Sequence, residues 1–192
     1  NICYYRENNL MVSILKTDKI QASHGSTIEI PTGHILHQPG MIIQTQVGQF
    51  QEGIGGHTRV QTSSQTPVAS NILVTITPKL STSKLLVNFS GQGAFNSGSA
   101  GNAMELYLYR SVGGASFAAA DLDSGKVTNY AAYSNSSDSI LHSVSFSWLD
   151  NPATTSTVIY KIYIASSNGA ANVKFGSNTQ DLTFISVMEI AQ

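Results

Sequence analysis

Period-two alternation of apolar and polar residues dominates the chain from residue 41 onward. Apolar side chains alternate with other residues over 41–47, 72–76, 85–89, 104–108, 144–148, 158–164 and 182–190. Successive side chains of a β-strand point to opposite faces of the sheet, so each run can bury one face. No stretch of a dozen residues shows the three- and four-residue apolar spacing and flanking caps of a helix. The pattern therefore predicts an all-β domain.

Turn-forming residues separate these runs, over 92–102, 112–116, 134–138, 151–156 and 166–172. Several short strands with this spacing predict an antiparallel jelly-roll or β-sandwich. Some runs are apolar on both faces, as at Ile185 with Val187 and at Tyr107 with Tyr109. A second apolar face in an antiparallel sheet indicates that a partner covers it.

The first 38 residues follow a different pattern. Two short strands are expected, over 15–20 and 27–30, between prolines and glycines, and the apolar residues are too few for a separate core. Such a segment gains order from neighbouring chains. We therefore expect an extended N-terminal arm over 1–38 and a head domain over 39–192. The stretch from Met11 reads like a protein start, which leaves residues 1–10 open as an upstream extension.

Composition narrows the function classes. Only 11% of residues are charged, whereas Ser, Thr, Asn and Gln make up 66 of 192. The net charge of −1 argues against a nucleic-acid partner. No apolar run approaches the roughly 18 residues of a membrane span, so no membrane insertion is expected. Cys3 is the one cysteine, which excludes an internal disulfide and a cysteine metal cluster.

The acidic residues are scattered, and Asp121 with Asp123 forms the one close pair. A glycan-cleaving site needs two carboxylates held across a sugar bond, and a calcium loop needs further acids at fixed spacing. A turn is the favoured interpretation of this pair. No G-x-S-x-G motif is present. We therefore expect no enzymatic activity and no cofactor.

His34 and His37 form an H-x-x-H pair near Pro31 and Pro39, which disfavour a helix there. One of these histidines from each of three symmetry-related chains would supply three ligands to an axial metal. Polar residues of the arm are the other interpretation, and both stay open.

Several segments together resemble one family. Residues 13–21 (SILKTDKIQ) are followed by a turn and by 26–33 (STIEIPTG), and then by 39–46 (PGMIIQTQ). Further matches lie at 83–87, 106–110, 148–156 and 185–190. In this order they resemble virion proteins of tailed phages, especially the fibre-like proteins of aquatic phages and cyanophages. A serine follows Arg110 where that family often has an acid.

The resemblance implies a jelly-roll head similar to the heads of complement C1q and tumour necrosis factor, which form trimers. It implies a homotrimeric, non-enzymatic short tail fibre of the virion that binds a host surface glycan or protein. Its partners are then other virion proteins of tail, neck or head. The arm residues that match the family's opening, and are expected to dock to the virion, are Leu15, Lys16, Asp18 and Ile20.

Host recognition is expected in the loops 93–102, 130–138 and 166–172. Exposed tyrosine beside asparagine and serine suits sugar or protein recognition, because it presents a flat apolar ring with a hydroxyl. The receptor-contact candidates are Asn96, Asn102, Tyr130, Tyr133, Asn135 and Asn168.

Three other functions stay open at this point. One is a head decoration or collar fibre without a receptor role. Another is a tailspike glycan depolymerase that uses Asp121 and Asp123. The third, a secreted C1q-like host protein, is disfavoured because the first ten residues lack a basic-then-apolar layout.

Overall fold

The computed structural model describes residues 38–51, 58–96, 101–120, 125–134, 140–170, 172–175 and 182–192, without the side chains of 92–96, 128–134, 140 and 141. The regular elements in these ranges are all β-strands, which confirms the all-β prediction. The described residues belong to a compact unit spanning His37–Gln192. Apart from Gln38, the predicted arm lies outside the described residues.

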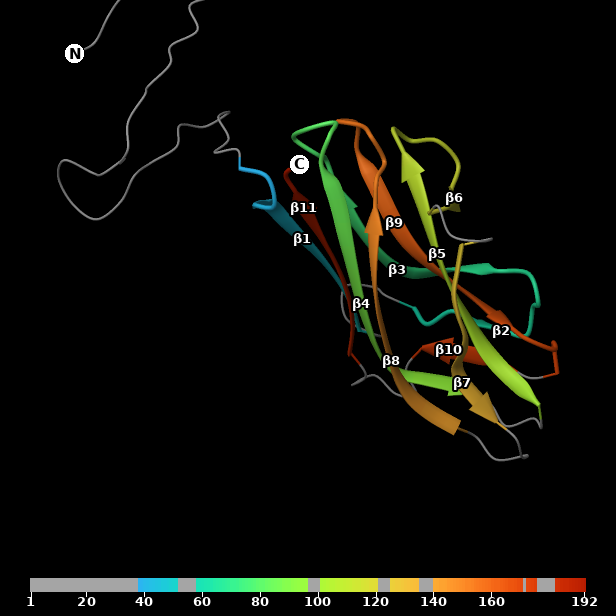
Figure 1. Ribbon diagram of the computed structural model, residues 1–192. Helices are drawn as coiled ribbons and strands as arrows, with labels where there is room; N and C mark the ends of the chain where they lie inside the picture. Colours follow the sequence, from blue (N-terminus) through green and yellow to red (C-terminus); the bar gives the residue numbers. More distant parts are fainter. Residues whose placement is uncertain are drawn as a thin grey trace, which may run out of the picture. The chain divides into compact units, whose positions relative to one another are not determined.

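The strands form two antiparallel sheets that pack as a sandwich (Figure 1). In the first sheet the strand order is β1 (Ile42–Gln51), β11 (Leu182–Ile190), β4 (Lys84–Asn96), β10 (Val173–Phe175) and β2 (Gln61–Thr62), and β8 (Ile140–Asp150) also pairs with β4. In the second sheet the order is β3 (Val68–Ile76), β9 (Val158–Ser166), β5 (Asn102–Val112) and β6 (Ala118–Ala119), and β7 (Lys126–Ser134) also pairs with β5. The predicted antiparallel β-sandwich is confirmed.

The core lies between the sheets and is built from alternate residues of the predicted strands. Its fully buried members include Val87 of β4, Leu106 of β5, Ile162 of β9 and Ile185 of β11. Burial of one such side chain contributes about 1.5 to 3 kcal/mol relative to exposure. Alternation in the sequence therefore located the inner face of β4, β5 and β9, whereas β11 is apolar on both faces and its alternating residues Phe184 and Met188 lie on the outer face.

In β1 the apolar residues are divided between the core and the outer face. The residues of this strand that turn inward include Gly48 and Phe50, and Phe50 is 5% exposed. Val47 is 63% exposed on the other face. A register shift opposite β11, between Ile42 and Gln44, accompanies this arrangement. The alternation over 41–47 thus predicted the strand but not its inner face, because Val47 lies on the outer face.

The turn expected over 92–102 is shorter than predicted. Strand β4 continues to Asn96, which pairs with Ile140 of β8 on one side and Val173 of β10 on the other. Neighbours on both sides supply the backbone hydrogen bonds that make this polar segment a strand despite its composition. In the same way β7 occupies the first part of the loop expected over 130–138.

At one end of the sandwich, the segment after Gln38 is hydrogen-bonded to the C-terminal residues. The backbone N–H of Gly40 donates to the carbonyl oxygen of Ala191 at 2.8 Å, and the N–H of Ala191 donates to the carbonyl oxygen of Met41 at 2.9 Å. This end therefore holds both Gln38, the last residue of the predicted arm, and the last residues of the chain. Strands β4, β7 and β9 run toward the opposite end, which we call the distal end (Figure 1).

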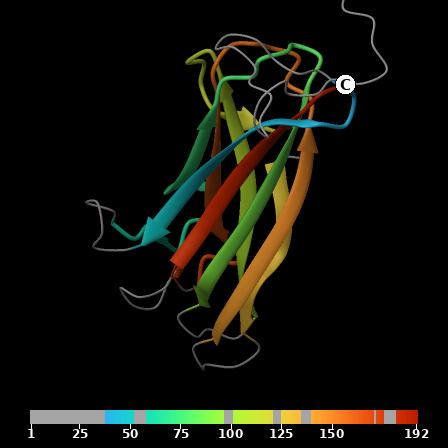
Figure 2. The ribbon, with the colours of Figure 1, turned by 90° about the vertical axis from the view of Figure 1, so that its left-hand side faces the viewer.

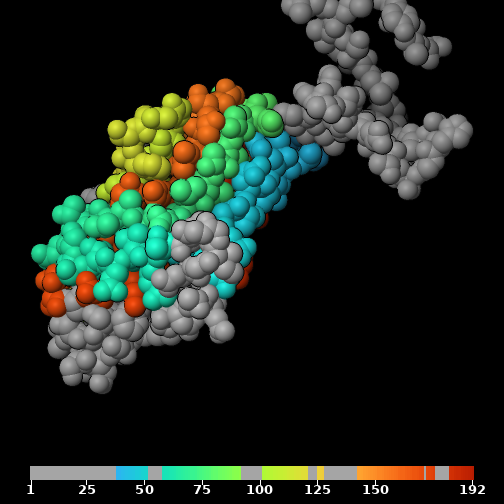
Figure 3. Space-filling model, turned by 180° about the vertical axis from the view of Figure 1, so that it is seen from behind, coloured from blue at the N-terminus to red at the C-terminus, as the bar shows by residue number. Residues whose placement is uncertain are grey.

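A close backbone approach joins β1 and β3 along one edge of the sandwich. In Figure 3 the blue residues of β1 adjoin teal and green residues on this side. A Cβ atom built on Gly48 would lie 1.9 Å from the carbonyl oxygen of Leu73 and 3.1 Å from the Ile185 side chain. Only glycine fits at residue 48, since the obstacle is backbone.

We expect Gly48→Ala to lower the free energy of unfolding by about 2 to 3 kcal/mol, because overpacking forces β1 away from β3. Chemical denaturation of the purified protein measures this loss. Thr75→Ala, at an exposed residue of β3, is the control and should change stability by less than about 0.5 kcal/mol. Equal stability of the Gly48 variant and wild type would contradict the close approach.

Candidate functional site

Polar segments at the distal end are hydrogen-bonded into one unit, here called the distal cluster: residues 62–66, 101–103 and 166–170. The N–H of Ser166 donates to the carbonyl oxygen of Ser64 at 2.8 Å, and the N–H of Ser167 donates to the carbonyl oxygen of Ala103 at 2.9 Å. The Gln65 side chain donates to the carbonyl of Ser167 at 3.1 Å. Three segments far apart in sequence are thereby fixed relative to one another.

Asn102 lies inside this cluster and not on its surface. Its side chain is fully buried, and its Oδ1 accepts a hydrogen bond from Ser166 Oγ at 2.8 Å. That hydroxyl in turn accepts from the N–H of Gly169 at 3.2 Å. The expectation that Asn102 contacts a receptor is therefore wrong for the described chain, because its amide is used to hold the loops together.

Asn168 is the predicted contact residue that the structure leaves exposed. Its Nδ2 donates to the carbonyl of Gly101 at 3.1 Å, and its Oδ1 accepts from the N–H of Ala170 at 2.9 Å. These two bonds fix the orientation of the amide at the surface. The structure thus brings Asn102 and Asn168 together, one as support and one as a surface group.

The remaining predicted contacts are described only in part. Asn96 ends β4, and Tyr133 pairs with Ala103 at the end of β7, so both belong to strands and not to the loops in which they were expected. Tyr130 also lies in β7. The side chains of all three are outside the described set, as is the whole of Asn135.

The other residues singled out in the sequence lie outside the described residues, and their roles stay predictions. These are Leu15, Lys16, Asp18, Ile20, His34, His37, Asp121 and Asp123. Within the described ranges no three His, Cys, Asp or Glu side chains gather where they would hold a metal ion. The same ranges hold no helix long and apolar enough to cross a membrane.

A charged cluster lies on the outer face of the second sheet. Glu105 of β5 accepts hydrogen bonds from the Tyr107 hydroxyl at 2.6 Å and from Lys126 Nζ at 2.9 Å. Burial raises the pKa of Tyr107, and the hydrogen bond to the Glu105 carboxylate raises it further. Burial alone would lower the pKa of Lys126, but its contacts with Glu105 and Tyr107 raise it overall. The charges of Lys126 and Glu105 therefore balance each other.

An aromatic cluster continues from these residues across β5 and β9. The rings of Tyr109 and Tyr163 stack with centroids 4.4 Å apart and planes 25° apart. Phe117 lies 6.2 Å from Tyr163, and Lys161 Nζ lies 5.5 Å above the Phe117 ring. The candidates chosen from the sequence did not include these residues, although the alternation of Tyr107 with Tyr109 indicated a second apolar face.

A buried carboxylate, Asp150, joins the two sheets at the end opposite the distal cluster. Asp150 of β8 accepts from the Tyr160 hydroxyl at 2.6 Å and pairs with Arg110, while its Oδ1 also accepts the N–H of Asn151 at 2.9 Å. Asp150 thus contacts both the start of the turn after β8 and the second sheet. Its link to β5 and β9 was missed, because neither partner is near it in sequence.

We expect Asn102→Ala to lower the free energy of unfolding by about 1 to 3 kcal/mol, since it leaves buried hydrogen-bonding groups of the cluster unpaired. Asn168→Ala, at an exposed residue, is the matched control and should cost less than about 0.5 kcal/mol. Chemical denaturation compares the two. Equal losses would contradict the division into a supporting and a surface asparagine.

Comparisons with known proteins complete this description. No protein-family model matches the chain, and no curated protein matches it. Among solved structures, the chain is similar to the crystal structure of the infectious bursal disease virus VP2 subviral particle, with 13% sequence identity and a TM-score of 0.37. The match covers 86% of this chain and 42% of the VP2 chain, so this chain spans less than half of that protein's length.

Proposed function

We propose that this chain is the trimeric short tail fibre protein of a phage virion, a non-enzymatic protein that attaches the particle to the host surface. The observation that carries the proposal is the division of the head between its two ends. Gln38, where the arm joins, lies at the end that also holds Ala191, and the distal cluster lies at the other. A head anchored through its arm would present the distal cluster to a host cell.

The outer face of the first sheet supports the trimer. Figure 2 shows its strands β1, β11, β4 and β8 side by side. The register aligns their outward residues in three rows across the sheet. The rows, which we call the first-sheet face, are Thr45–Met188–Leu86–Leu149, Val47–Ser186–Asn88–Ser147 and Gln49–Phe184–Ser90–Ser145.

Exposed apolar side chains are concentrated on this face. Val47 is 63%, Leu149 48% and Phe184 38% exposed. No residue of the three rows is charged, and the polar side chains among them are neutral, such as Asn88, which accepts from Ser147 Oγ at 2.7 Å. A face of apolar and neutral polar side chains can be buried between subunits without ion desolvation.

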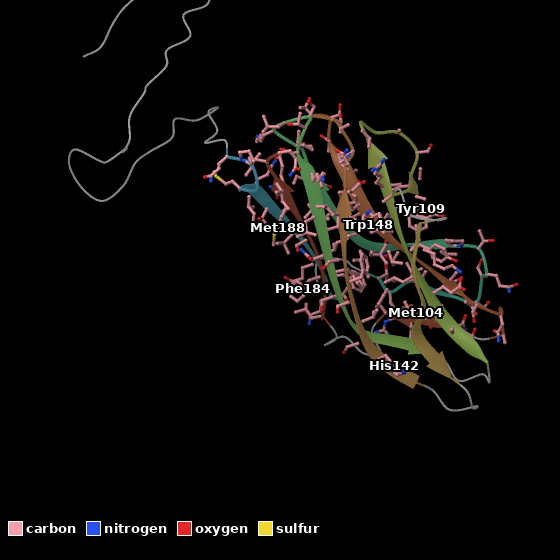
Figure 4. The ribbon with its side chains drawn as sticks, in the orientation of Figure 1. Met104, Tyr109, His142, Trp148, Phe184 and Met188 are labelled. Carbon is pink, nitrogen blue, oxygen red and sulfur yellow. The ribbon has the colours of Figure 1, made fainter. Side chains whose placement is uncertain are left out.

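A threefold axis beside this face would bury it in all three chains at once. Each chain would contact both neighbours, and the ring would close. In Figure 4, Met188 and Phe184 lie on one side of the sandwich and Tyr109 on the other. The aromatic cluster of the second sheet would therefore stay on the outside of such a trimer.

We expect wild-type protein to sediment with three times the 20.4 kDa mass of one chain, and Leu149→Asp or Phe184→Asp to sediment as a monomer. Each aspartate would place a charge in the buried interface. Analytical ultracentrifugation at micromolar concentration measures the mass, and circular dichroism checks that the variants keep their strands.

Leu73→Asp is the matched control for this experiment. Leu73 is 41% exposed, as apolar as Leu149, and lies on the second sheet. This variant should remain trimeric. A monomeric wild type would refute the trimer, and dissociation of Leu73→Asp alone would move the interface to the other sheet.

Attachment then works by multivalency, because three weak sites on one rigid head raise avidity without new contacts. Purified trimer, preincubated with host cells of the virus that encodes it, should block adsorption of virus particles. The monomeric Leu149→Asp variant should need at least about a hundredfold higher concentration for the same block.

Immunogold labelling of intact particles is the accompanying measurement, and it should place the protein on the tail or neck. Labelled particles with no block of adsorption would indicate a decoration or collar protein in place of a receptor-binding fibre. Absence of label from the particles would refute the virion assignment altogether.

A further inference from the structure

The outer face of the second sheet carries a half-buried aromatic surface built from neighbouring strands. Tyr109 of β5 and Tyr163 of β9 stack at 4.4 Å, and Tyr107 meets the edge of Tyr109 at 6.4 Å. Phe117, from the segment between β5 and β6, extends the surface past Tyr163 at 6.2 Å. We call Tyr109, Tyr163 and Phe117 the aromatic platform; all three rings are partly exposed.

The platform is positioned by regular backbone. Tyr107 lies directly opposite Tyr163 in the β5–β9 ladder, and Tyr109 lies opposite Lys161. On the other edge of Tyr109, a Cβ atom on Gly125 would approach the ring to 2.6 Å, so the backbone of residue 125 packs against it. Rings held by paired strands and a close backbone contact form a preorganised surface.

One cation of this surface has no acidic partner among the described residues. Lys161 Nζ lies over the Phe117 ring at 5.5 Å and makes no ion pair in the described part of the chain. The nearby Lys126, in contrast, is paired with Glu105 at 2.9 Å. The platform therefore has a positive charge at Lys161 that the described carboxylates do not neutralise.

Flat rings beside a single cation suit a particular ligand chemistry. Aromatic rings pack against the C–H face of a pyranose, and tyrosine hydroxyls can hydrogen-bond to its hydroxyl groups. Burial, together with the neighbouring Tyr109, raises the pKa of Tyr163, so this phenol keeps its proton at neutral pH. A lysine ammonium binds a carboxylate or a sulfate group.

From this juxtaposition we propose that the aromatic platform with Lys161 is a binding site for an acidic saccharide, a sugar that carries a carboxylate or sulfate group. This inference goes beyond the proposed attachment function, because it uses neither the distal cluster nor the arm. A single-stranded nucleic acid would also stack on tyrosine, but its phosphate chain requires several cations along one track.

Titration calorimetry on the full chain tests the site with defined probes. Oligogalacturonate presents carboxylates, dextran sulfate presents sulfates, and dextran is the neutral control. We expect saturable binding of at least one acidic probe, weakening as salt is added, and no measurable binding of dextran. Binding of neither acidic probe, or equal binding of dextran, overturns the proposal.

Two pairs of variants separate the contribution of charge to binding from the contribution of ring stacking. Lys161→Gln should weaken binding of the acidic probe about tenfold or more, whereas Lys79→Gln, at an exposed lysine of the segment between β3 and β4, should leave it unchanged. Tyr163→Leu should weaken binding by a similar factor, whereas Tyr163→Phe keeps the ring and most of the affinity. Thermal unfolding of each variant checks the fold.

Two further results would overturn the proposal. One is equal affinity of Lys161→Gln and Lys79→Gln for the acidic probe. The other is that polyglutamate or oligothymidylate binds as tightly as the saccharide, which would indicate simple charge attraction or a nucleic-acid surface. Both results are independent of the adsorption experiment, so either function can fail while the other stands.

Discussion

A buried carboxylate must be paired, and this requirement fixes how the two sheets meet. Asp150 belongs to the first sheet, whereas its partners Arg110 and Tyr160 belong to the second. Without them the charge would be buried unpaired, at a cost of several kcal/mol. The bonds therefore favour one relative position of β8 against β5 and β9, and the apolar core fills the space that this position leaves.

A second buried carboxylate acts at the same end. Glu189 of β11 accepts from the side chain of Gln44 at 2.6 Å and from the N–H groups of Lys79 and Leu80 at 2.8 and 3.0 Å. It joins β1 to the segment after β3, so both sheets are connected there once more. The end that receives the predicted arm is thus held by charge-assisted hydrogen bonds, which are stronger than neutral ones.

The sequence predicted the strands well and the polar contacts poorly, for a physical reason. Alternation is local, so runs such as 85–89 and 104–108 identify strands and their inner faces without knowledge of their neighbours. Hydrogen-bond partners depend on the folded topology: Gln44 and Glu189 are 145 residues apart, and Arg110 and Asp150 are 40 apart. The burial of Asn102 was not predicted for the same reason. A polar residue at the start of a strand resembles a loop residue in sequence, and the fold alone shows that its partner is Ser166.

The two ends of the sandwich use different polar groups, which bears on the low charge of the chain. In the described chain the two carboxylates that link the sheets lie at the arm end, whereas the distal cluster uses hydroxyl, amide and backbone groups alone. Neutral hydrogen bonds are little affected by salt, and their groups can be covered by a ligand without ion desolvation. The first-sheet face is neutral in the same way. The second sheet differs, because Lys161 beside the aromatic platform adds one charge that the described carboxylates do not neutralise, next to the balanced pair of Lys126 and Glu105. In the proposed saccharide site, this one unbalanced charge would select for an acidic ligand.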